Sequence, residues 1–355
     1  MSPEWLTSVL KPELRADSQV VGVRYERIGG PGSFVGDLAR LSLDYRGDGG
    51  GIRTVIAKIP TKDHSARARF AAAGFYYREN AFYRHLAESC GVRSPVAYYV
   101  AEDQKRTEYV LLLEDLGGMR TGDHLDGCSR EDARLVVWEL AKLHAHWWND
   151  GSLEQYRVWL PAQTDAQTER WGSWFNSRLP ELARSLAGLV SPDFAEVAQL
   201  VGRQYRDLWA LQRLAPFAVN HGDCRLENVL FDKRGGKARP AFLDWQAVCR
   251  GNPLRDISYF LATNFETDRR RNEEIDLLTY YHEALMVNGV TNYSMEQCFD
   301  DFQRAGLLLV GAVAWVAASL GDEPTNPEGQ QLLRRLIRRQ AQAALDADPA
   351  NTLAR

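Results

Sequence analysis

The sequence predicts an α+β protein with two lobes, a smaller one built on an antiparallel sheet and a larger one that is mostly helical. Strand-like segments with short glycine-rich connections occupy the first part of the chain, and helical segments occupy most of the rest. The length of 355 residues also exceeds what one hydrophobic core normally supports. We expect the division to fall after residue 116, at Gly117-Gly118, which gives lobes of residues 1–116 and 117–355.

The first strands are expected at residues 20–28, 38–45 and 52–60, which are rich in β-branched and aromatic residues or alternate in polarity. Glycine-rich stretches at 29–37 and 46–51 connect them. Consecutive strands with such short connections pair antiparallel, which disfavours a βαβ nucleotide-binding fold. Two further strands are expected at 96–101 and 109–114.

A helix is expected over residues 65–90, between the third and fourth strands. Phe75, Phe82 and Leu86 fall on one stripe of it, and Glu79 lies within that stripe. A carboxylate on the inward face of a helix needs a partner, because burying an unpaired charge is strongly unfavourable.

The rest of the chain reads as helices. Ser129 and Asp132 form a capping-box-like start for a helix that runs to about residue 148. Further helices are expected at 165–188, 192–213, 270–288, 295–320 and 327–346. The exception is a strand–turn–strand signal over residues 229–245.

The composition is that of an ordinary globular protein, with 45% hydrophobic and 25% charged residues. This excludes a disordered chain, a collagen-like fibre and a disulfide scaffold. A net charge of −4 disfavours a nucleic-acid partner. Five scattered cysteines without a Cys-x-x-Cys pair fit a reducing compartment.

No membrane partner is expected. The N-terminus lacks the unbroken apolar run of a secretory signal. Residues 305–320 carry no charge but fall short of the roughly 20 apolar residues of a membrane span. We interpret them as a buried core helix and expect a cytoplasmic protein, whose oligomeric state the sequence leaves open.

The segment with the most chemical information is HGDCRLENVLFD, residues 221–232. If the strands around it pair as a hairpin centred on Gly236, Asn228 and Asp244 face each other at its open end. An amide oxygen and a carboxylate at close range suit Mg²⁺, which keeps its waters and bridges phosphates. Asp223, five residues before Asn228, would reach the same region.

These motifs resemble those of a known superfamily. H-x-D-x-x-x-x-N followed by an aspartate after the next strand is similar to the catalytic and metal-binding loops of protein-kinase-like enzymes. HGD with D-W in place of D-F-G resembles the aminoglycoside phosphotransferase and choline kinase branch. HGDCRLENVLF, FLDWQ and GNPLRDISYFL look closest to the ecdysteroid kinase-like and acyl-CoA-associated kinases. The resemblance covers about residues 20–320 and implies a bilobal protein-kinase-like fold.

The resemblance also implies a nucleotide site in the first lobe. Lys58, in the sequence V-I-A-K, would clamp the α- and β-phosphates, and Glu79 would orient it. The glycine-containing turn at 29–36 would contact the nucleotide through Ser33 and Phe34, although it departs from G-x-G-x-x-G. The linker would contact adenine near Glu114 and Leu116.

Catalysis is implied for the second lobe. Asp223 would orient or deprotonate the acceptor hydroxyl, and Asn228 and Asp244 would hold Mg²⁺ on the phosphates. Arg225 stands where many Ser/Thr kinases carry a lysine near the γ-phosphate, so it would neutralise developing charge. Asp256 would brace the catalytic loop from a buried position by accepting backbone N–H bonds.

The function implied is a small-molecule kinase that transfers the γ-phosphoryl group of MgATP or GTP to a hydroxyl. A non-catalytic, pseudokinase-like nucleotide-binding scaffold is the alternative, disfavoured because the lysine and both aspartates are present. A protein kinase is disfavoured because D-W-Q replaces D-F-G and no A-P-E follows in residues 247–264.

The acceptor stays open between an antibiotic, an amino alcohol, a sterol-like hydroxyl and a hydroxyacyl thioester, with the subgroup favouring an apolar or acyl compound. Residues 266–301 hold nine acidic residues against three arginines. This segment is either an ordinary charged surface or an acidic wall that binds a cationic substrate. Two clusters of side chains have a structural and a substrate-binding interpretation. They are the arginines Arg334, Arg335, Arg338 and Arg339, which would be solvated or bind a phosphorylated or CoA-type substrate, and the tryptophans Trp147, Trp148, Trp171 and Trp174, which would be core residues or stack on substrate.

Overall fold

The computed structural model describes residues 1–28, 36–47, 51–103, 105, 107–122, 127–162, 164–232, 239–322 and 327–354. The predicted nucleotide contacts Ser33 and Phe34 lie outside the described residues, as does Gly236 at the expected centre of the hairpin.

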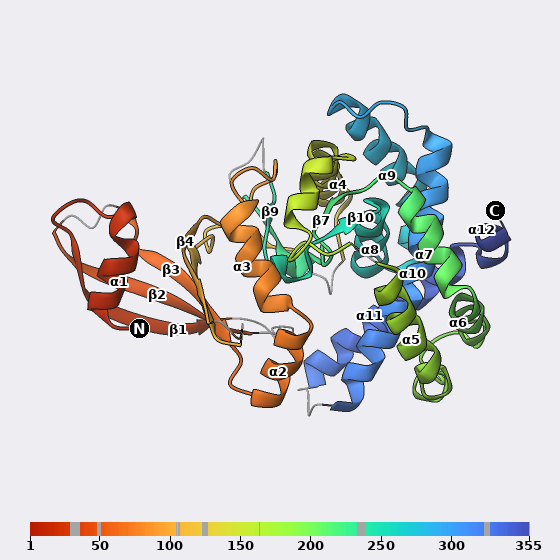
Figure 1. Cartoon of the computed structure of the whole chain (residues 1–355), viewed down its shortest axis with the longest axis horizontal. Helices are drawn as coiled ribbons and strands as arrows, with labels where there is room; N and C mark the ends of the chain where they lie inside the picture. Colours follow the sequence, from red (N-terminus) through yellow and green to blue (C-terminus); the bar gives the residue numbers. More distant parts are fainter. Residues whose placement is uncertain are drawn as a thin grey trace.

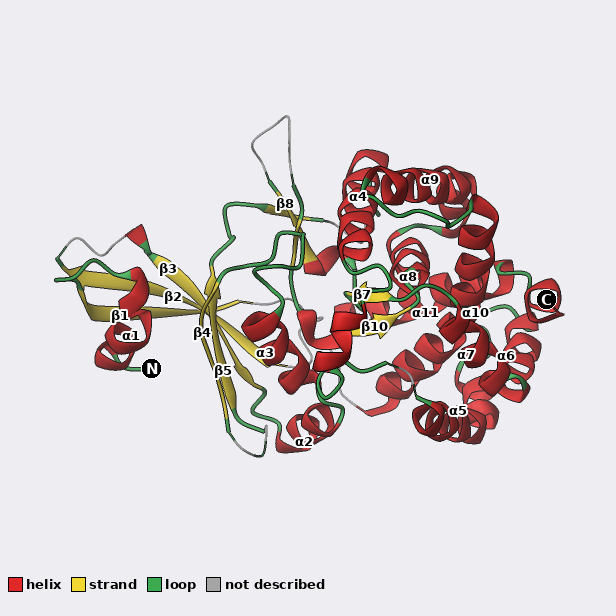
Figure 2. Ribbon diagram, turned by 45° about the horizontal axis from the view of Figure 1, so that its top comes forward, coloured by secondary structure: helices red, strands yellow, loops and turns green. Residues whose placement is uncertain are grey.

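One end of the molecule is a five-stranded antiparallel sheet, and helices fill the other end (Figures 1 and 2). This confirms the predicted α+β class with an antiparallel sheet in the N-terminal part. The strand order is β1-β2-β3-β5-β4, and every neighbouring pair is antiparallel. The strands are β1 (Gln19–Ile28), β2 (Gly36–Arg46), β3 (Thr54–Pro60), β4 (Ala97–Glu102) and β5 (Tyr109–Glu114).

A short helix that the sequence did not predict, α1 (Pro3–Leu10), packs against this sheet and is followed by a 3₁₀ turn, η1 (Lys11–Glu13). Leu6 and Leu10 of α1 are fully buried with Leu41 of β2 and Val55 of β3. The N-terminal sheet therefore has a small hydrophobic core of its own.

The prediction of a single helix over residues 65–90 is wrong, because the structure has two helices there. They are α2 (His64–Ala72) and α3 (Phe75–His85), separated by Gly74 in the left-handed conformation with φ of +77°. This backbone conformation is accessible to glycine and interrupts a helix. The inward stripe is retained in α3, where Glu79 and Phe82 are buried.

The remainder of the chain is mainly helical. Its α-helices are α4 (Arg130–His146), α5 (Asp165–Ser185), α6 (Asp193–Arg203), α7 (Tyr205–Leu214), α8 (Leu254–Asn264), α9 (Thr267–Val287), α10 (Met295–Asp322), α11 (Pro327–Asp346) and α12 (Pro349–Ala354). Short strands and 3₁₀ turns accompany them: β6 (Arg120–Thr121), β7 (Ala218–Asn220), β8 (Val229–Phe231), β9 (Ala241–Phe242), β10 (Cys249–Gly251), η3 (Gly151–Tyr156), η4 (Leu226–Asn228) and η5 (Trp245–Ala247).

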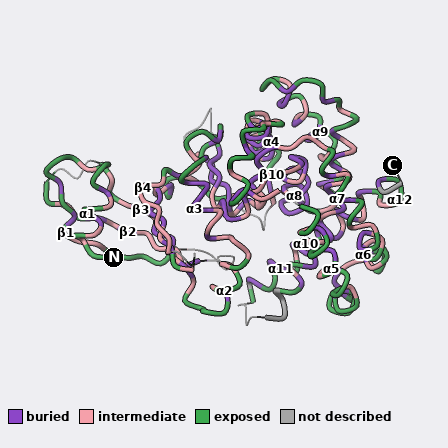
Figure 3. Tube along the Cα trace, in the orientation of Figure 1, coloured by how far each residue is buried: buried purple, intermediate pink, exposed green. Residues whose placement is uncertain are grey.

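Two helix predictions need correction in this region. The segment 192–213 forms α6 and α7, which are separated at Gln204, rather than one helix. Helix α8 was not predicted, and it lies at the centre of the helical part, where most of its residues are buried (Figure 3).

The predicted hairpin at 229–245 forms, but its register differs by one residue from the expected one. Val229 pairs with Phe242 and Leu230 with Ala241, and the backbone oxygen of Asn228 accepts a hydrogen bond from Leu243. Asn228 is therefore opposite Leu243 rather than Asp244. Asp244 follows the hairpin with a left-handed φ of 62°.

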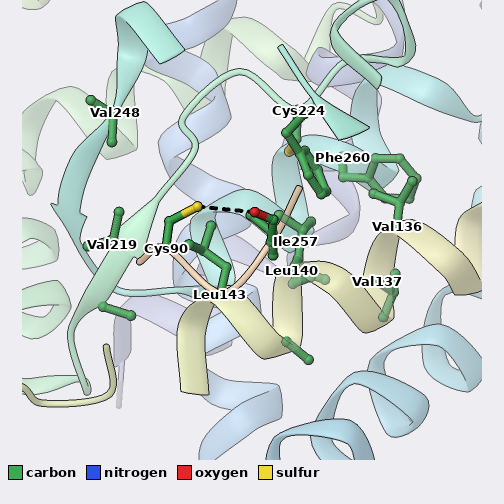
Figure 4. Packing of buried hydrophobic residues seen from close by; sticks show 14 of the residues in the cluster. Cys90, Val136, Val137, Leu140, Leu143, Val219, Cys224, Val248, Ile257 and Phe260 are labelled. Carbon is green, nitrogen blue, oxygen red and sulfur yellow. Dashed lines mark hydrogen bonds between the residues drawn. The ribbon is translucent and has the colours of Figure 1, made fainter. Parts of the chain in front are cut away.

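The main core joins α4, α8 and the loop after β7. Figure 4 shows Val136 and Leu140 of α4 close to Ile257 and Phe260 of α8, with Cys224 of that loop among them. All five side chains are at most 1% exposed. The loop that carries HGD is therefore built on the close-packed core of the helical region.

Helix α10 contains the uncharged segment that we expected to be a core helix. Among the described residues, Met295–Ala318 is long and apolar enough to cross a membrane, and 56% of its most apolar window is buried. Leu307, Val310 and Val313 are fully buried, and α10 packs against α8 and α11.

Truncating one of these side chains should destabilise the helical region. We expect Leu307→Ala to lower the free energy of unfolding by about 2–4 kcal/mol, because it leaves a cavity in a close-packed core. Urea unfolding followed by circular dichroism measures this. Ile275→Ala, at a position 52% exposed, is the control and should change stability by less than about 0.5 kcal/mol. Equal effects of the two substitutions would contradict the core position of α10.

Candidate active site

The HGD loop connects β7 to η4 and requires glycine at its second position. Gly222 has φ of +83°, and a Cβ atom there would lie 2.3 Å from the backbone oxygen of Ala247. Both the backbone conformation and this close approach exclude larger residues. The contact also places the HGD loop directly beside the D-W-Q segment.

Asp256 of α8 holds the backbone of the loop. Its carboxylate accepts hydrogen bonds from the amides of His221 (2.7 Å) and Gly222 (2.9 Å), as the family resemblance implied. Burial favours the neutral acid, but hydrogen bonding and charge from His144, with the Gly222 amide, outweigh it and keep the pKa of Asp256 below its usual value. Asp256 is thus a charged structural brace.

His221 links the loop to the hairpin. Its Nδ1 atom accepts a hydrogen bond from the Asp223 amide at 3.2 Å, so its proton is on Nε2, which donates to the backbone oxygen of Leu243 at 2.9 Å. These two contacts fix the direction in which the loop leaves the hairpin.

Two further braces were missed by the sequence analysis. His144 of α4 lies 3.3 Å from the Asp256 carboxylate and 2.8 Å from the hydroxyl of Tyr281. Asn264 of α8 accepts a hydrogen bond from the Leu226 amide at 2.9 Å. The spacing of Leu254, Ile257 and Leu261, just after a proline, was the available signal for α8.

Asp223, the candidate catalytic residue, already has partners for its carboxylate. Arg225 donates from Nε to Oδ1 at 2.8 Å and from Nη2 to Oδ2 at 3.1 Å, and the Tyr259 hydroxyl donates to Oδ1 at 3.0 Å. Burial would raise the pKa of Asp223, but the charge and hydrogen bonds of Arg225, with His221 and Tyr259, hold it below the usual value. The Arg225 guanidinium, expected near the γ-phosphate, thus contacts Asp223 here.

A buried ion-pair cluster joins the sheet to the D-W-Q segment. Lys58 Nζ of β3 lies 2.7 Å from a carboxylate oxygen of Glu79 on α3 and 2.6 Å from Oδ1 of Asp244. Glu79 therefore finds the partner that its inward position required. The structure brings these three predicted site residues together from three separate segments.

Electrostatics keeps the ammonium group of Lys58 charged. Burial opposes the charge of Lys58, but the carboxylates of Asp244 and Glu79 outweigh it and raise the pKa of Lys58 well above its usual value. Burial raises the pKa of Glu79 to about 7 against the opposing charge of Lys58, and the charge of Asp244 adds to the rise. The two carboxylates therefore compete for one ammonium group.

Aromatic packing fixes α3 against the D-W-Q segment. The rings of Phe82 and Trp245 stack with centroids 3.9 Å apart and planes at 9°. Arg78 donates a hydrogen bond to the backbone oxygen of Gln246 at 2.9 Å. These contacts hold α3, which carries Glu79, against the segment that carries Asp244.

The residues present fit a Mg²⁺ ion. The amide nitrogen of Asn228 donates to the backbone oxygen of Asp223 at 2.8 Å, which leaves its side-chain oxygen as a ligand. Asp244 uses only Oδ1 for Lys58 among the described residues, so Oδ2 can coordinate metal. The described residues contain no group of three or more His, Cys, Asp or Glu suited to a metal. A two-ligand site that also uses substrate phosphates is typical of Mg²⁺.

Glu114 and Leu116 lie where the sheet leads into the helical part. The Glu114 carboxylate accepts a hydrogen bond from the Val96 amide at 3.3 Å, so its side chain has a structural partner. Leu116 is buried against Leu230 and Ala241 of the hairpin. The chain between them is held by Asp115, whose carboxylate pairs with Arg40 at 2.7 Å.

The acidic segment noted in the sequence is largely paired, and one of the four clustered arginines is buried. Arg339 is 3% exposed and donates to the backbone oxygen of Thr263 and to Glu266, so it does not share a solvated face with the other arginines. Most acids of the 266–301 segment form ion pairs with arginine. The pairs are Glu266–Arg339, Asp268–Arg271, Glu273–Arg269, Glu274–Arg270, Asp276–Arg130 and Asp301–Arg304.

Comparison of the sequence with known families gives one match over most of the chain. The model of the ecdysteroid kinase-like family matches residues 32–289. A Caenorhabditis elegans protein named uncharacterized oxidoreductase dhs-27 is 23% identical over 228 residues, which make up 61% of this chain and 27% of that protein. The chain thus spans about a quarter of the length of this relative.

Solved structures with the same fold include kinases of small molecules. Choline kinase LicA from Streptococcus pneumoniae superposes with a TM-score of 0.54 at 14% identity, covering 95% of this chain and 96% of that one. Plasmodium vivax ethanolamine kinase superposes with a TM-score of 0.54 at 11% identity, covering 88% of this chain and 81% of that one. The GDP complex of an aminoglycoside 2′-phosphotransferase superposes with a TM-score of 0.53 at 12% identity, covering 94% of this chain and 96% of that one.

Replacing the brace of the loop should destabilise the protein in a pH-dependent way. We expect Asp256→Asn to lower the free energy of unfolding by about 2–4 kcal/mol near pH 7, because buried hydrogen bonds to a charge are lost. The folded pKa of Asp256 lies below its usual value of 3.8. The stabilisation is therefore complete above about pH 4 and disappears as the pH falls through the folded pKa.

Urea unfolding of both proteins between pH 3 and 7 checks this, and the difference between them should narrow on acidification. Asp276→Asn removes an exposed ion pair and is the control, with little change at any pH. A difference between wild type and Asp256→Asn that does not depend on pH would contradict the assignment.

Proposed function

The chain belongs to the ecdysteroid kinase-like family, and we propose that it is a small-molecule kinase that transfers the γ-phosphoryl group of MgATP or GTP to a hydroxyl of a small substrate. The observation that carries this proposal is the ion-pair cluster of Lys58, Glu79 and Asp244 beside the HGD loop with Asp223. Phosphoryl transfer needs little covalent chemistry from the protein, so a set of positioned charges of this kind is what it requires.

Each residue has a role in this proposal. Lys58 clamps the α- and β-phosphates, and Glu79 holds its ammonium in place. Asn228 and Asp244 would hold Mg²⁺, which would neutralise phosphate charge. The Lys58 ammonium, which contacts Asp244 here, would bind phosphate oxygens of a nucleotide, and the Asp244 carboxylate would then be available to a metal ion.

The nucleotide base would be placed against the strand end around Glu114 and Leu116. The Leu116 carbonyl already accepts a hydrogen bond from the Met119 amide at 2.8 Å, so we assign adenine recognition to the other backbone groups of this segment. Ser33 and Phe34 keep their proposed role in contacting the nucleotide. We retain the lobe division after residue 116 and a cytoplasmic location as parts of the proposal.

For the acceptor, we favour an apolar or acyl compound over a cationic one. The acids of the 266–301 segment are mostly occupied by arginines, which leaves little charge for an amino alcohol or an aminoglycoside. In contrast, Trp171 and Trp315 are 41% and 44% exposed and pack edge-to-face with centroids 6.0 Å apart. Exposed tryptophans in contact are typical of surfaces that bind apolar groups.

The test is release of ADP from ATP with Mg²⁺ in the presence of hydroxylated compounds. A thermal-shift screen of antibiotics, amino alcohols, sterols and hydroxyacyl thioesters, run with a non-hydrolysable ATP analogue, selects the acceptors to assay. If the protein binds ATP but releases no ADP with any of the compounds that the screen selects, the result would instead support the non-catalytic scaffold.

Two substitutions should separate chemistry from nucleotide binding. Asp223→Asn should lower kcat by about 10²–10⁴-fold with ATP affinity nearly unchanged, because the acceptor proton loses its partner. Asp244→Asn should weaken binding of MgATP at least about tenfold, because the metal loses a charged ligand. Steady-state kinetics and calorimetric titration with MgATP measure both effects.

Asp276→Asn, on the surface of α9, is the matched control and should change neither quantity. Wild-type turnover in Asp223→Asn would remove this residue from the mechanism. Unchanged MgATP affinity in Asp244→Asn would remove the proposed metal ligand.

A further inference from the structure

Tyr259 directly contacts the candidate catalytic carboxylate. Its hydroxyl donates to Oδ1 of Asp223 at 3.0 Å from the middle of α8. Its ring is half-buried and packs against both large hydrophobic clusters of the helical region. The position of the hydroxyl is therefore set by the core rather than by a flexible loop.

The same helix fixes the loop at two other points. Asp256 accepts the amides of His221 and Gly222, and Asn264 accepts the amide of Leu226. Asp256, Tyr259 and Asn264 are spaced by three and five residues, so they project from neighbouring turns of α8 toward one loop. Tyr259 contacts the reactive side chain, and the other two contact the backbone.

Counting hydrogen bonds shows which oxygen of Asp223 can receive a further donor. A carboxylate offers about four acceptor sites, two on each oxygen. Oδ1 accepts from both Arg225 Nε at 2.8 Å and Tyr259. Oδ2 accepts from Arg225 Nη2 at 3.1 Å, and no other described residue donates to it. One site is left, and it is on Oδ2.

We propose that Tyr259 is a positioning residue that, together with Arg225, saturates Oδ1 of Asp223 and so directs the acceptor hydroxyl to Oδ2. This inference rests on the proposed kinase function. The inference adds to that function a positioning residue outside the HGD loop and the oxygen atom of Asp223 that receives the proton.

The step balances as an ordinary phosphoryl transfer. The acceptor oxygen forms a bond to the γ-phosphorus while the bond from that phosphorus to the β,γ-bridging oxygen breaks and the nucleoside diphosphate leaves. The acceptor proton passes to Oδ2 of Asp223 and then to solvent. Because proton transfer is late in a loose transition state, orientation of the hydroxyl matters more than the basicity of Asp223.

Tyr259→Phe removes the hydroxyl and keeps the ring in the core. The assay measures ADP release from MgATP, with water or a compound from the screen as the phosphoryl acceptor. We expect kcat to fall about tenfold while KM for ATP stays within about twofold of the wild-type value. Tyr293→Phe is the matched control, because the Tyr293 hydroxyl donates to the buried Asp301 at 2.9 Å. It should leave kcat unchanged. A wild-type kcat in Tyr259→Phe would overturn the proposal.

A second measurement does not depend on activity. 3-Fluorotyrosine placed at position 259 should give a ¹⁹F resonance that shifts in the Asp223→Asn protein, because the hydrogen-bond acceptor changes. The same label at position 293 should not respond to Asp223→Asn. No shift at position 259 would overturn the contact, even in an active enzyme.

The two measurements separate the two hypotheses. Wild-type protein that releases no ADP would overturn the proposed function, and the fluorine signal would still decide whether Tyr259 holds Asp223. An active wild type with an unaffected Tyr259→Phe variant would overturn only the role of Tyr259.

Discussion

The structure depends most on one buried ammonium group shared by two carboxylates. Lys58 lies in the central strand β3, Glu79 in α3 and Asp244 after the hairpin, and their charged atoms meet within 2.8 Å of the lysine. A buried charge without partners is strongly unfavourable, so the close approach of the three segments removes a cost that each charge would otherwise carry in the folded protein. The sheet, the helix and the D-W-Q segment are thereby joined at the place where we propose that nucleotide phosphates bind.

Helix α8 performs the corresponding task for the loop that contains Asp223. It bonds to the loop backbone through Asp256 and Asn264 and to the candidate catalytic carboxylate through Tyr259. Because α8 is itself packed inside the main core, the loop needs no long strands to hold its shape. Rigid support of this kind places reactive groups precisely without reorganisation during the reaction.

Much of the architecture was predictable, because strands and surface helices carry periodic patterns. The five strands of the sheet fall within two residues of their predicted bounds. Helix α8 was not predicted because nearly all of it is buried and several of its buried residues are polar, which weakens the apolar pattern of Leu254, Ile257 and Leu261. The hairpin register was wrong by one residue because register depends on the geometry of the turn, which composition does not determine.

The amino-acid sequence by itself determined which chemical groups the protein has: the lysine, the helix glutamate and the HGD–N–D set in order, and with them the family. Only the tertiary structure decided the partners of those groups. That Arg225 lies on Asp223, that Lys58 is shared by two carboxylates and that Tyr259 reaches the loop all depend on distances between segments far apart in the chain. Such distances are set by packing of the whole core, which no local pattern of residues encodes.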